Sequence, residues 1–234
     1  RLSQHDANTL YATFNNHMRG DFKPYVLKST DLGRSWTSIA SDLPARGSVW
    51  TIAEDFVDRD LLFVGTDFGV FVTRDGGAHW VKLGNGLPTI QVREIAIQKR
   101  ENDLVLATFG RGFYVLDDYS ALRGITAQSL GQEATLYPTR DSVPLYNVGG
   151  EGQQTLPQWA APNPESGAVF TYSVAKDLGA DAKLVITITD STGKQVRRVE
   201  VPKTIGLNRY AWNLRTDAGV TQAGGPGLVE PAEF

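Results

Sequence analysis

An eight-residue pattern occurs twice in the chain and constrains its fold more than any other feature. Residues 29–36 read STDLGRSW and residues 73–80 read TRDGGAHW, so both fit the pattern Ser/Thr-x-Asp-x-Gly-x-x-Trp. The two copies lie 44 residues apart (75 − 31). Each copy separates two runs of strand-like composition, which predicts that it forms the turn of a β-hairpin.

The residue types of this pattern suit a tight turn. The Asp carboxylate can accept hydrogen bonds from backbone N–H groups, and the Gly can adopt a positive φ. The Trp starts the next strand and is expected to bury its ring against a neighbouring unit. We interpret the carboxylates as turn-forming rather than catalytic. The structural residues predicted are Ser29, Asp31, Gly33, Trp36, Thr73, Asp75, Gly77 and Trp80.

Residues 1–120 contain a repeat that includes this pattern. Residues 61–72 (LLFVGTDFGVFV) resemble residues 104–115 (LVLATFGRGFYV), which follow 43 residues later (104 − 61). A four-stranded unit of this length has the size of a propeller blade. The fold class expected is therefore all-β, with residues 1–120 forming about two to three blades at the C-terminal end of a β-propeller. Strands are expected at 10–15, 25–29, 36–40, 49–54, 61–66, 69–73, 80–83, 92–98, 104–108 and 112–116.

The remainder of the chain changes character twice. Residues 121–167 are expected to hold one strand (134–139) that returns to the propeller, followed by a Gly/Pro-rich linker in which Trp159 docks on a domain surface. Residues 168–234 are expected to form an immunoglobulin-like β-sandwich with Trp212 in its core; such a domain usually has ~100 residues, so a truncated one is predicted. Its expected strands are 169–174, 183–189, 195–201 and 208–214.

Composition excludes several classes of function. The net charge of −3 gives no basic field for nucleic acid. The absence of Cys excludes disulfides and thiolate metal sites, and the three His residues are widely separated, so neither a metal nor a cofactor is expected. No apolar run approaches the ~20 residues needed to span a bilayer. No signal peptide is visible in this segment.

The repeated pattern resembles the Asp-box of the bacterial neuraminidase repeat, which occurs in sialidases and sortilin-type receptors. Other stretches resemble secreted bacterial propeller proteins of the sortilin type, often labelled glycosyl hydrolases: 65–71 (GTDFGVF), 100–108 (RENDLVLAT) and 110–118 (GRGFYVLDD). Residues 206–215 (GLNRYAWNLR) are similar to the immunoglobulin-like domain of flagellar hook-capping proteins. The resemblance implies structural Asp-boxes away from any active centre and an extracellular or periplasmic location. Members usually have His where this chain has Phe109.

Two polar stretches are candidates for ligand binding. The first contains His17, Arg19, Asp21 and Tyr25 and is longer than a tight hairpin requires; functional groups concentrate in such loops. The second is Arg111, whose flanking glycines allow a backbone to approach a ligand closely. The alternative for the first is a hydrogen-bonded loop that packs on the next blade, and for the second an ordinary β-turn.

No catalytic set is recognisable in the sequence. Arg93 and Arg111 are of the type that a sialidase uses to clamp a carboxylate, but their spacing does not place them together. Asp55, Asp58 and Asp60 lie in one turn and are interpreted as a solvated connection.

The expected function is an extracytoplasmic interaction module that binds protein, peptide or polysaccharide. The module would be a fragment of a larger propeller protein whose other blades lie upstream, since closed propellers use about 4–8 blades. The alternative is a glycoside hydrolase, sialidase-like or other, with most of its catalytic residues on those upstream blades. Whether the chain belongs to an enzyme stays open.

Overall fold

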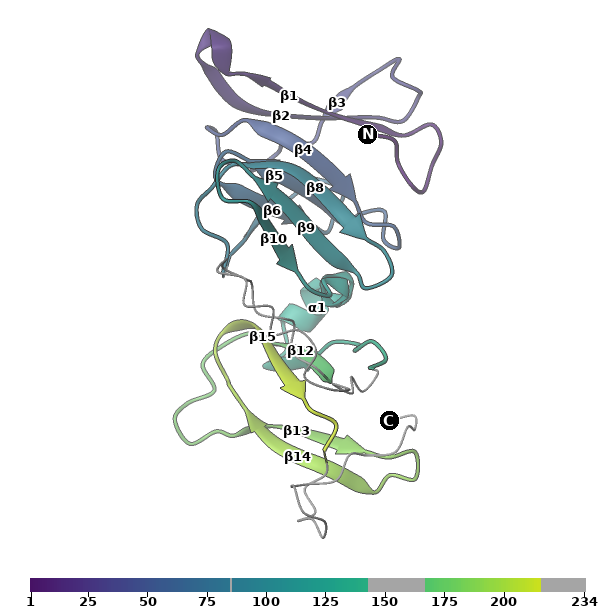
Figure 1. Ribbon diagram of the computed structural model, residues 1–234, viewed down its shortest axis with the longest axis vertical. Coiled ribbons are helices and arrows are strands. Elements are labelled where there is room, and N and C mark those ends of the chain that lie inside the picture. The colour runs from purple at the N-terminus through teal and green to yellow at the C-terminus, as the bar shows by residue number, and fades with distance from the viewer. Residues whose placement is uncertain (85, 143–166, 216–234) are drawn as a thin grey trace, which may run out of the picture. The chain divides into compact units, whose positions relative to one another are not determined.

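The computed structural model describes residues 1–84, 86–142 and 167–215. The chain divides into two compact units, Arg1–Arg123 and Gly124–Phe234, which are described separately (Figure 1). The expected Gly/Pro-rich linker with Trp159, and the expected end of the second domain, lie outside the described residues. Within the described part of the chain, no helix has the length and apolar character to cross a membrane.

Unit 1 contains three antiparallel sheets that follow one another along the chain, with strand orders β1-β2-β3, β4-β5-β6-β7 and β10-β9-β8 (Figure 1). The second sheet is a four-stranded meander, the arrangement of a propeller blade, so the predicted all-β, partial-propeller fold is confirmed. The elements are β1 Leu10–Asn16, η1 His17–Arg19, β2 Asp21–Ser29, β3 Thr37–Ser38, β4 Val49–Glu54, β5 Leu62–Thr66, β6 Gly69–Thr73, β7 Val81–Leu83, β8 Val92–Gln98, β9 Asp103–Thr108, β10 Phe113–Leu116 and η2 Ser120–Gly124.

Successive sheets of unit 1 pack against one another. Tyr11 of the first sheet and Ile52 of the second belong to one buried apolar cluster. Phe63 of β5 meets the ring of Tyr119, which follows the third sheet, edge to face at a centroid distance of 5.2 Å. Gly65 of β5 lies so close to β8 that an added Cβ would be 2.7 Å from a backbone oxygen there. The three sheets therefore share continuous packing, as neighbouring blades do.

The first copy of the repeated pattern forms a hydrogen-bonded turn between β2 and β3. The Ser29 hydroxyl donates to the Asp31 carboxylate (2.8 Å) and accepts from the backbone N–H of Gly33 (2.8 Å). Asp31 also accepts from the backbone N–H and hydroxyl of Ser35, at 2.9 and 2.6 Å. These bonds, led by the one from the Ser35 hydroxyl, lower the pKa of Asp31 to about 2.

The second copy forms the same turn between β6 and β7. The Thr73 hydroxyl donates to Asp75 (2.7 Å) and accepts from the N–H of Gly77 (3.1 Å), and Asp75 accepts from the backbone N–H of His79 (2.9 Å). Burial raises the pKa of Asp75, but the hydrogen bonds from Thr73 and His79 outweigh it and bring the pKa to about 2. Both carboxylates thus organise a turn, as the sequence predicts.

The two tryptophans of the pattern differ in burial, which corrects the expectation that both rings are buried. Trp80 is 6% exposed, and its indole N–H donates to the backbone oxygen of Ile39, which follows β3 in the preceding sheet (2.8 Å). Trp36 is 42% exposed, and its indole N–H donates to Gly33 within its own turn (3.0 Å). The physical reason is that the first described sheet has no preceding described sheet on which its ring could pack.

Unit 2 has two small antiparallel sheets, β11-β12-β15 and β13-β14, around one apolar cluster. Tyr172 of β12, Ile186 of β13 and Trp212 of β15 all belong to this cluster, and Trp212 is 2% exposed, as predicted. The immunoglobulin-like assignment itself stays a prediction. The elements are α1 Ala127–Leu130, β11 Ala134–Leu136, β12 Ala168–Val174, β13 Leu184–Thr189, β14 Gln195–Val201 and β15 Gly206–Trp212.

Strand β11 belongs to unit 2, which differs from the expectation that residues 134–139 form a strand that returns to the propeller. Ala134 pairs with Val174 of β12, and the Tyr137 hydroxyl lies 3.0 Å from the Ser173 hydroxyl. An extended segment must pair its backbone groups with some strand, but its own sequence does not specify which. The edge of β12 provides that partner.

Candidate functional site

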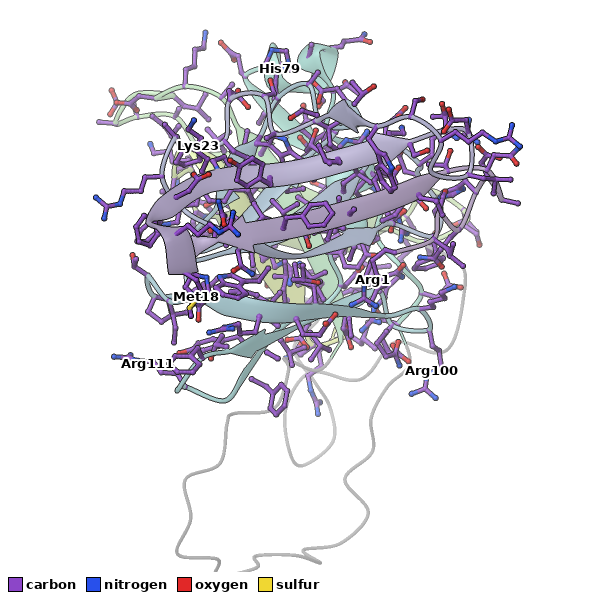
Figure 2. All side chains as sticks on the ribbon, turned by 90° about the horizontal axis from the view of Figure 1, so that it is seen from above. Arg1, Met18, Lys23, His79, Arg100 and Arg111 are labelled. Carbon is purple, nitrogen blue, oxygen red and sulfur yellow. The ribbon has the colours of Figure 1, made fainter. Side chains whose placement is uncertain are left out.

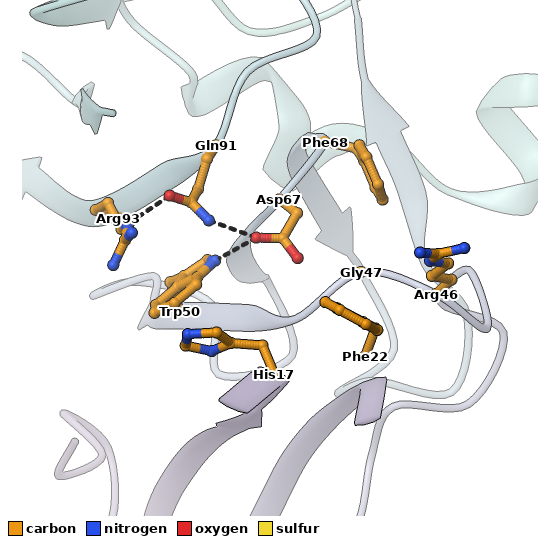
Figure 3. Close-up of a pocket in the computed structure, with 9 residues that line it drawn as sticks. All are labelled: His17, Phe22, Arg46, Gly47, Trp50, Asp67, Phe68, Gln91 and Arg93. Atoms are coloured by element: carbon orange, nitrogen blue, oxygen red, sulfur yellow. Dashed lines mark hydrogen bonds between the residues drawn. The ribbon is translucent and has the colours of Figure 1, made fainter. Parts of the chain in front are cut away.

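Unit 1 has a pocket of about 390 Å³ where its three sheets meet at one end (Figure 3). The lining comes from the β1–β2 hairpin, the segment that leads into β4, the turn between β5 and β6, and the start of β8. Residues from all three blade-like sheets therefore contribute to one site. The lining residues are His17, Phe22, Arg46, Gly47, Trp50, Asp67, Phe68, Gln91 and Arg93.

Asp67, in the β5–β6 turn, is the carboxylate of this pocket. It accepts hydrogen bonds from the indole N–H of Trp50 (2.7 Å), the side-chain amide of Gln91 (2.5 Å) and the backbone N–H of Ser48 (2.8 Å). Burial raises the pKa of Asp67, but these hydrogen bonds outweigh it, so the net effect lowers the pKa. Asp67 is consequently ionised at neutral pH and serves to fix the side chains around it.

The Trp50 ring forms the floor of the pocket and is covered by two side chains. The Arg93 guanidinium carbon lies 3.7 Å from the centroid of the Trp50 ring, a cation–π contact. The His17 ring lies 5.6 Å from the same ring at an interplanar angle of 51°. The Arg93 side chain also donates to Gln91, so a chain of hydrogen bonds links Arg93 through Gln91 to Asp67 (Figure 3).

The opposite wall combines apolar rings with a second guanidinium group. Arg46 lies over the ring of Phe22 at 5.1 Å, and the backbone N–H of Gly47 donates to the Phe22 oxygen (2.7 Å). Gly47 has φ +145°, and a Cβ there would lie 3.1 Å from the ring of Phe68. Glycine thus allows the loop to pass close beneath Phe68, which keeps 43% of its surface exposed at the mouth of the pocket.

Of the predicted ligand-binding residues, only His17 lines this pocket. The stretch from His17 to Tyr25 is not the long loop that the sequence analysis assumed, because η1 and Gly20 (φ +75°) turn the chain tightly and β2 begins at Asp21. The Tyr25 hydroxyl donates to the Asp21 carboxylate (2.6 Å), and this bond, the largest effect, lowers the pKa of Asp21. The alternative of a hydrogen-bonded structural pair describes Asp21 and Tyr25 well.

Arg19 and Arg111 are exposed in the β1–β2 and β9–β10 hairpins and do not line the pocket. The second hairpin nevertheless reaches the pocket, because Arg93 lies over the ring of Phe109 at 5.1 Å. The structure therefore brings Arg93 and the hairpin of Arg111 to the same end of unit 1, which the sequence spacing could not show. Their assignment to ligand binding stays a prediction.

Sequence reasoning did not identify Trp50, Asp67 or Gln91 as site residues. Asp67 belongs to a hairpin turn and Trp50 to a strand of apolar residues, so neither stands out in the sequence as a site residue. One signal was present: the repeat aligns residues 66–68 (TDF) with residues 109–111 (FGR), so the turn that bears Arg111 corresponds to the turn that bears Asp67.

The predicted solvated connection at Asp55, Asp58 and Asp60 is wrong for Asp55. Its side chain is fully buried and is paired with Arg123 at 2.7 Å. Asp58 pairs with Arg74 at 2.7 Å. The cationic partners, Arg123 and Arg74, lie 68 and 16 residues further along the chain, so the sequence around these carboxylates does not reveal them. Among the residues that the structure describes, no group of three or more His, Asp or Glu side chains is arranged to hold a metal ion.

No protein-family model matches the chain, and no curated protein matches its sequence. Among solved structures the chain is similar to the GH74 enzyme of Niastella koreensis (17% identity, TM-score 0.42, covering 85% of this chain and 29% of that one). It is also similar to the GH74 xyloglucanase of Xanthomonas campestris (17% identity, TM-score 0.39, 84% and 30%). A third is YCF48 bound to D1 peptide (21% identity, TM-score 0.32, 41% and 30%).

The chain thus spans about 30% of the length of these neighbours, which are β-propeller proteins. Its function is inferred below from its own residues.

Proposed function

We propose that the chain is an interaction module of a larger, extracytoplasmic propeller protein, and that it binds a protein, peptide or polysaccharide ligand in the pocket of Figure 3. The location outside the cytoplasm rests on the family resemblance. Unit 2, as an immunoglobulin-like domain, would form part of this module. The pocket supplies two guanidinium groups, several aromatic rings and a rigid floor, which are features of a recognition surface.

The state of Asp67 is the observation that carries this proposal. Glycoside hydrolysis needs two facing carboxyl groups about 5–9.5 Å apart, one of which has a raised pKa so that it can act as an acid. Asp67 is the only carboxylate among the lining residues, its pKa is lowered, and three donors occupy it. Such a carboxylate holds Trp50 and Gln91 in place and is poorly suited to donate a proton.

The test compares binding with turnover in the same preparation. The full chain is applied to arrays of glycans and of random peptides, and it is incubated with a panel of chromogenic glycosides and polysaccharides. We expect array binding that Arg93→Ala weakens, without release of sugar. Arg93 is exposed, so its substitution leaves the fold intact, and Arg100→Ala, at an exposed ion pair in another loop, is the matched control.

Release of sugar that is lost on Asp67→Asn would overturn the proposal and favour the glycoside hydrolase. Absence of binding on both arrays by a well-folded sample would also count against it.

A further inference from the structure

Four arginines gather at the pocket end of unit 1. Arg46 and Arg93 line the pocket itself. Arg19 lies in η1 beside His17, whose ring contacts the Trp50 floor, and Arg111 lies in the hairpin whose Phe109 contacts Arg93. Figure 2 shows Met18, Lys23 and Arg111 toward one side of unit 1, and Arg1 and Arg100 toward the other. We call the set Arg19, Arg46, Arg93 and Arg111 the arginine face.

The four guanidinium groups of the arginine face are not engaged in ion pairs with Asp or Glu within the described part of the chain. Four of the six other arginines of unit 1 form ion pairs: Arg1 with Glu94, Arg74 with Asp58, Arg100 with Glu101 and Arg123 with Asp55.

The carboxylates that do lie at this end are occupied by internal hydrogen bonds. Asp21 accepts from the Tyr25 hydroxyl, and Asp67 accepts from Trp50, Gln91 and the Ser48 N–H. Both have lowered pKa values, so both are ionised, but their lone pairs are directed at those donors. Four guanidinium groups against these two carboxylates leave this end with an excess of positive charge, which is available to an external anion.

Large apolar side chains are interspersed with these arginines. Met18 is 88% exposed, Phe109 is 68% exposed and Phe68 is 43% exposed. Each lies in a hairpin at the same end of unit 1: Met18 directly precedes Arg19, Phe68 directly follows Asp67, and Phe109 lies two residues before Arg111. An exposed set of apolar groups beside unpaired guanidinium groups is complementary to a ligand that presents apolar and anionic groups together.

We propose that the arginine face binds an acidic polypeptide segment in which Asp or Glu side chains alternate with apolar ones. This inference rests on the proposed function and adds the class of partner. The guanidinium groups would pair with side-chain carboxylates in bidentate fashion, while Met18, Phe68 and Phe109 would cover the apolar side chains.

A peptide fits this surface better than a polysaccharide does. Sugar rings stack flat on an open aromatic face, but the face of Trp50 in the pocket is covered by Arg93 at 3.7 Å. Sugar hydroxyl groups also need hydrogen-bond acceptors, but the carboxylate oxygens of Asp67 already accept from Trp50, Gln91 and the Ser48 N–H. An acidic peptide matches what the surface offers, because its side-chain carboxylates accept from guanidinium donors and its apolar side chains contact exposed apolar groups.

The experiment selects binders of the full chain from a random peptide library and, in parallel, probes an array that includes uronate-containing glycans. We expect the selected peptides to be enriched in Asp and Glu together with Leu, Phe or Trp. A synthetic peptide from the selection should lose at least tenfold in affinity when its Glu and Asp are changed to Gln and Asn. Its affinity should also fall as the salt concentration rises.

Variants of the chain test whether the peptide binds at the arginine face. Arg46→Gln and Arg111→Gln, both at exposed positions, should each weaken the selected peptide about tenfold, whereas Arg100→Gln on the other side should not. Unchanged thermal unfolding confirms that each variant is folded. Three results would overturn the inference and still support a binding function: selected peptides without acidic enrichment, equal effects of all three variants, or binding of uronate glycans alone. Absence of any ligand would instead count against the proposed function.

Discussion

Arg123 donates hydrogen bonds through Nε and Nη2 to both carboxylate oxygens of Asp55, at 3.0 and 2.7 Å, across 68 residues of sequence. The Asp55 side chain is fully buried, and the Tyr119 hydroxyl donates to it as well (2.6 Å). Burial raises the pKa of Asp55, but the bonds from Arg123 and Tyr119 outweigh it and lower the pKa. Asp55 follows β4 and Arg123 follows β10, so this pair ties the end of unit 1 to its second sheet.

Arg123→Met is expected to lower the free energy of unfolding by about 3–5 kcal/mol, because it leaves the buried Asp55 carboxylate without its cation. Arg100→Met is the control, since the Arg100–Glu101 pair is exposed and contributes at most ~1 kcal/mol. Urea unfolding of the two variants measures the difference. Equal losses of unfolding free energy in the two variants would show that the buried pair contributes no more to stability than the exposed one.

The second repeated turn predicts a pH dependence. The folded pKa of Asp75 is about 2, below its ordinary 3.8, so the carboxylate stabilises the fold above pH 3.8 and loses that effect as the pH falls toward 2. The hydrogen bond to Asp75 raises the pKa of His79 above 6.5, so that interaction is fully present below pH 6.5 and is lost as the pH rises through the higher value. The stability difference between the wild type and Asp75→Asn should be greatest between these limits.

Denaturant unfolding at a series of pH values measures that difference. Asp60→Asn is the control, because the exposed Asp60 side chain accepts no hydrogen bond among the described residues. A pH-independent difference for Asp75→Asn would contradict the role assigned to its carboxylate.

Gly65→Ala tests the packing of the second sheet on the third. The new methyl group would lie 2.7 Å from the backbone oxygen of Val92 and 2.8 Å from Thr51 Cγ2, so β5 and β8 must separate. We expect a loss of about 1–3 kcal/mol in the free energy of unfolding. Gly84→Ala is the matched control because nothing lies within 4 Å of its Cβ position. Similar thermal unfolding of both variants would argue against close contact between the sheets.

The two tryptophans of the repeated pattern should differ in energetic weight. Trp80→Ala removes a ring that is 6% exposed and should cost about 3–5 kcal/mol. Trp36→Ala removes a ring that is 42% exposed and should cost less than half as much, because less apolar surface returns to water. Chemical denaturation gives both values. A larger loss for Trp36→Ala would mean that its ring is buried in solution.

Much of the fold was readable from the sequence because its signals are local. Short runs of strand-forming residues between turns predicted β4, β6, β8 and β14 with the observed bounds, Val49–Glu54, Gly69–Thr73, Val92–Gln98 and Gln195–Val201. Hydrogen bonds within each eight-residue turn involve residues two to four positions apart, so Asp31 and Asp75 were assigned correctly from spacing alone.

Most of the candidate site could not be predicted from the sequence, because its residues come together only when the three sheets pack. Trp50 and Asp67 are 17 residues apart, and His17 and Arg93 reach the same ring from the first and third sheets. Each of these residues has an ordinary structural explanation in its own segment. Only their convergence distinguishes them from the other turn and strand residues of the repeat.

The sequence by itself therefore determined the all-β class, the blade-sized repeat and its turns, since these depend on interactions between near neighbours in the chain. The tertiary structure alone decided that Asp55 is buried against Arg123, that β11 pairs with β12, and that Arg93 covers Trp50. Each of those outcomes joins residues from distant segments. Their partners are selected by packing and by the need to satisfy buried polar groups, which no local pattern encodes.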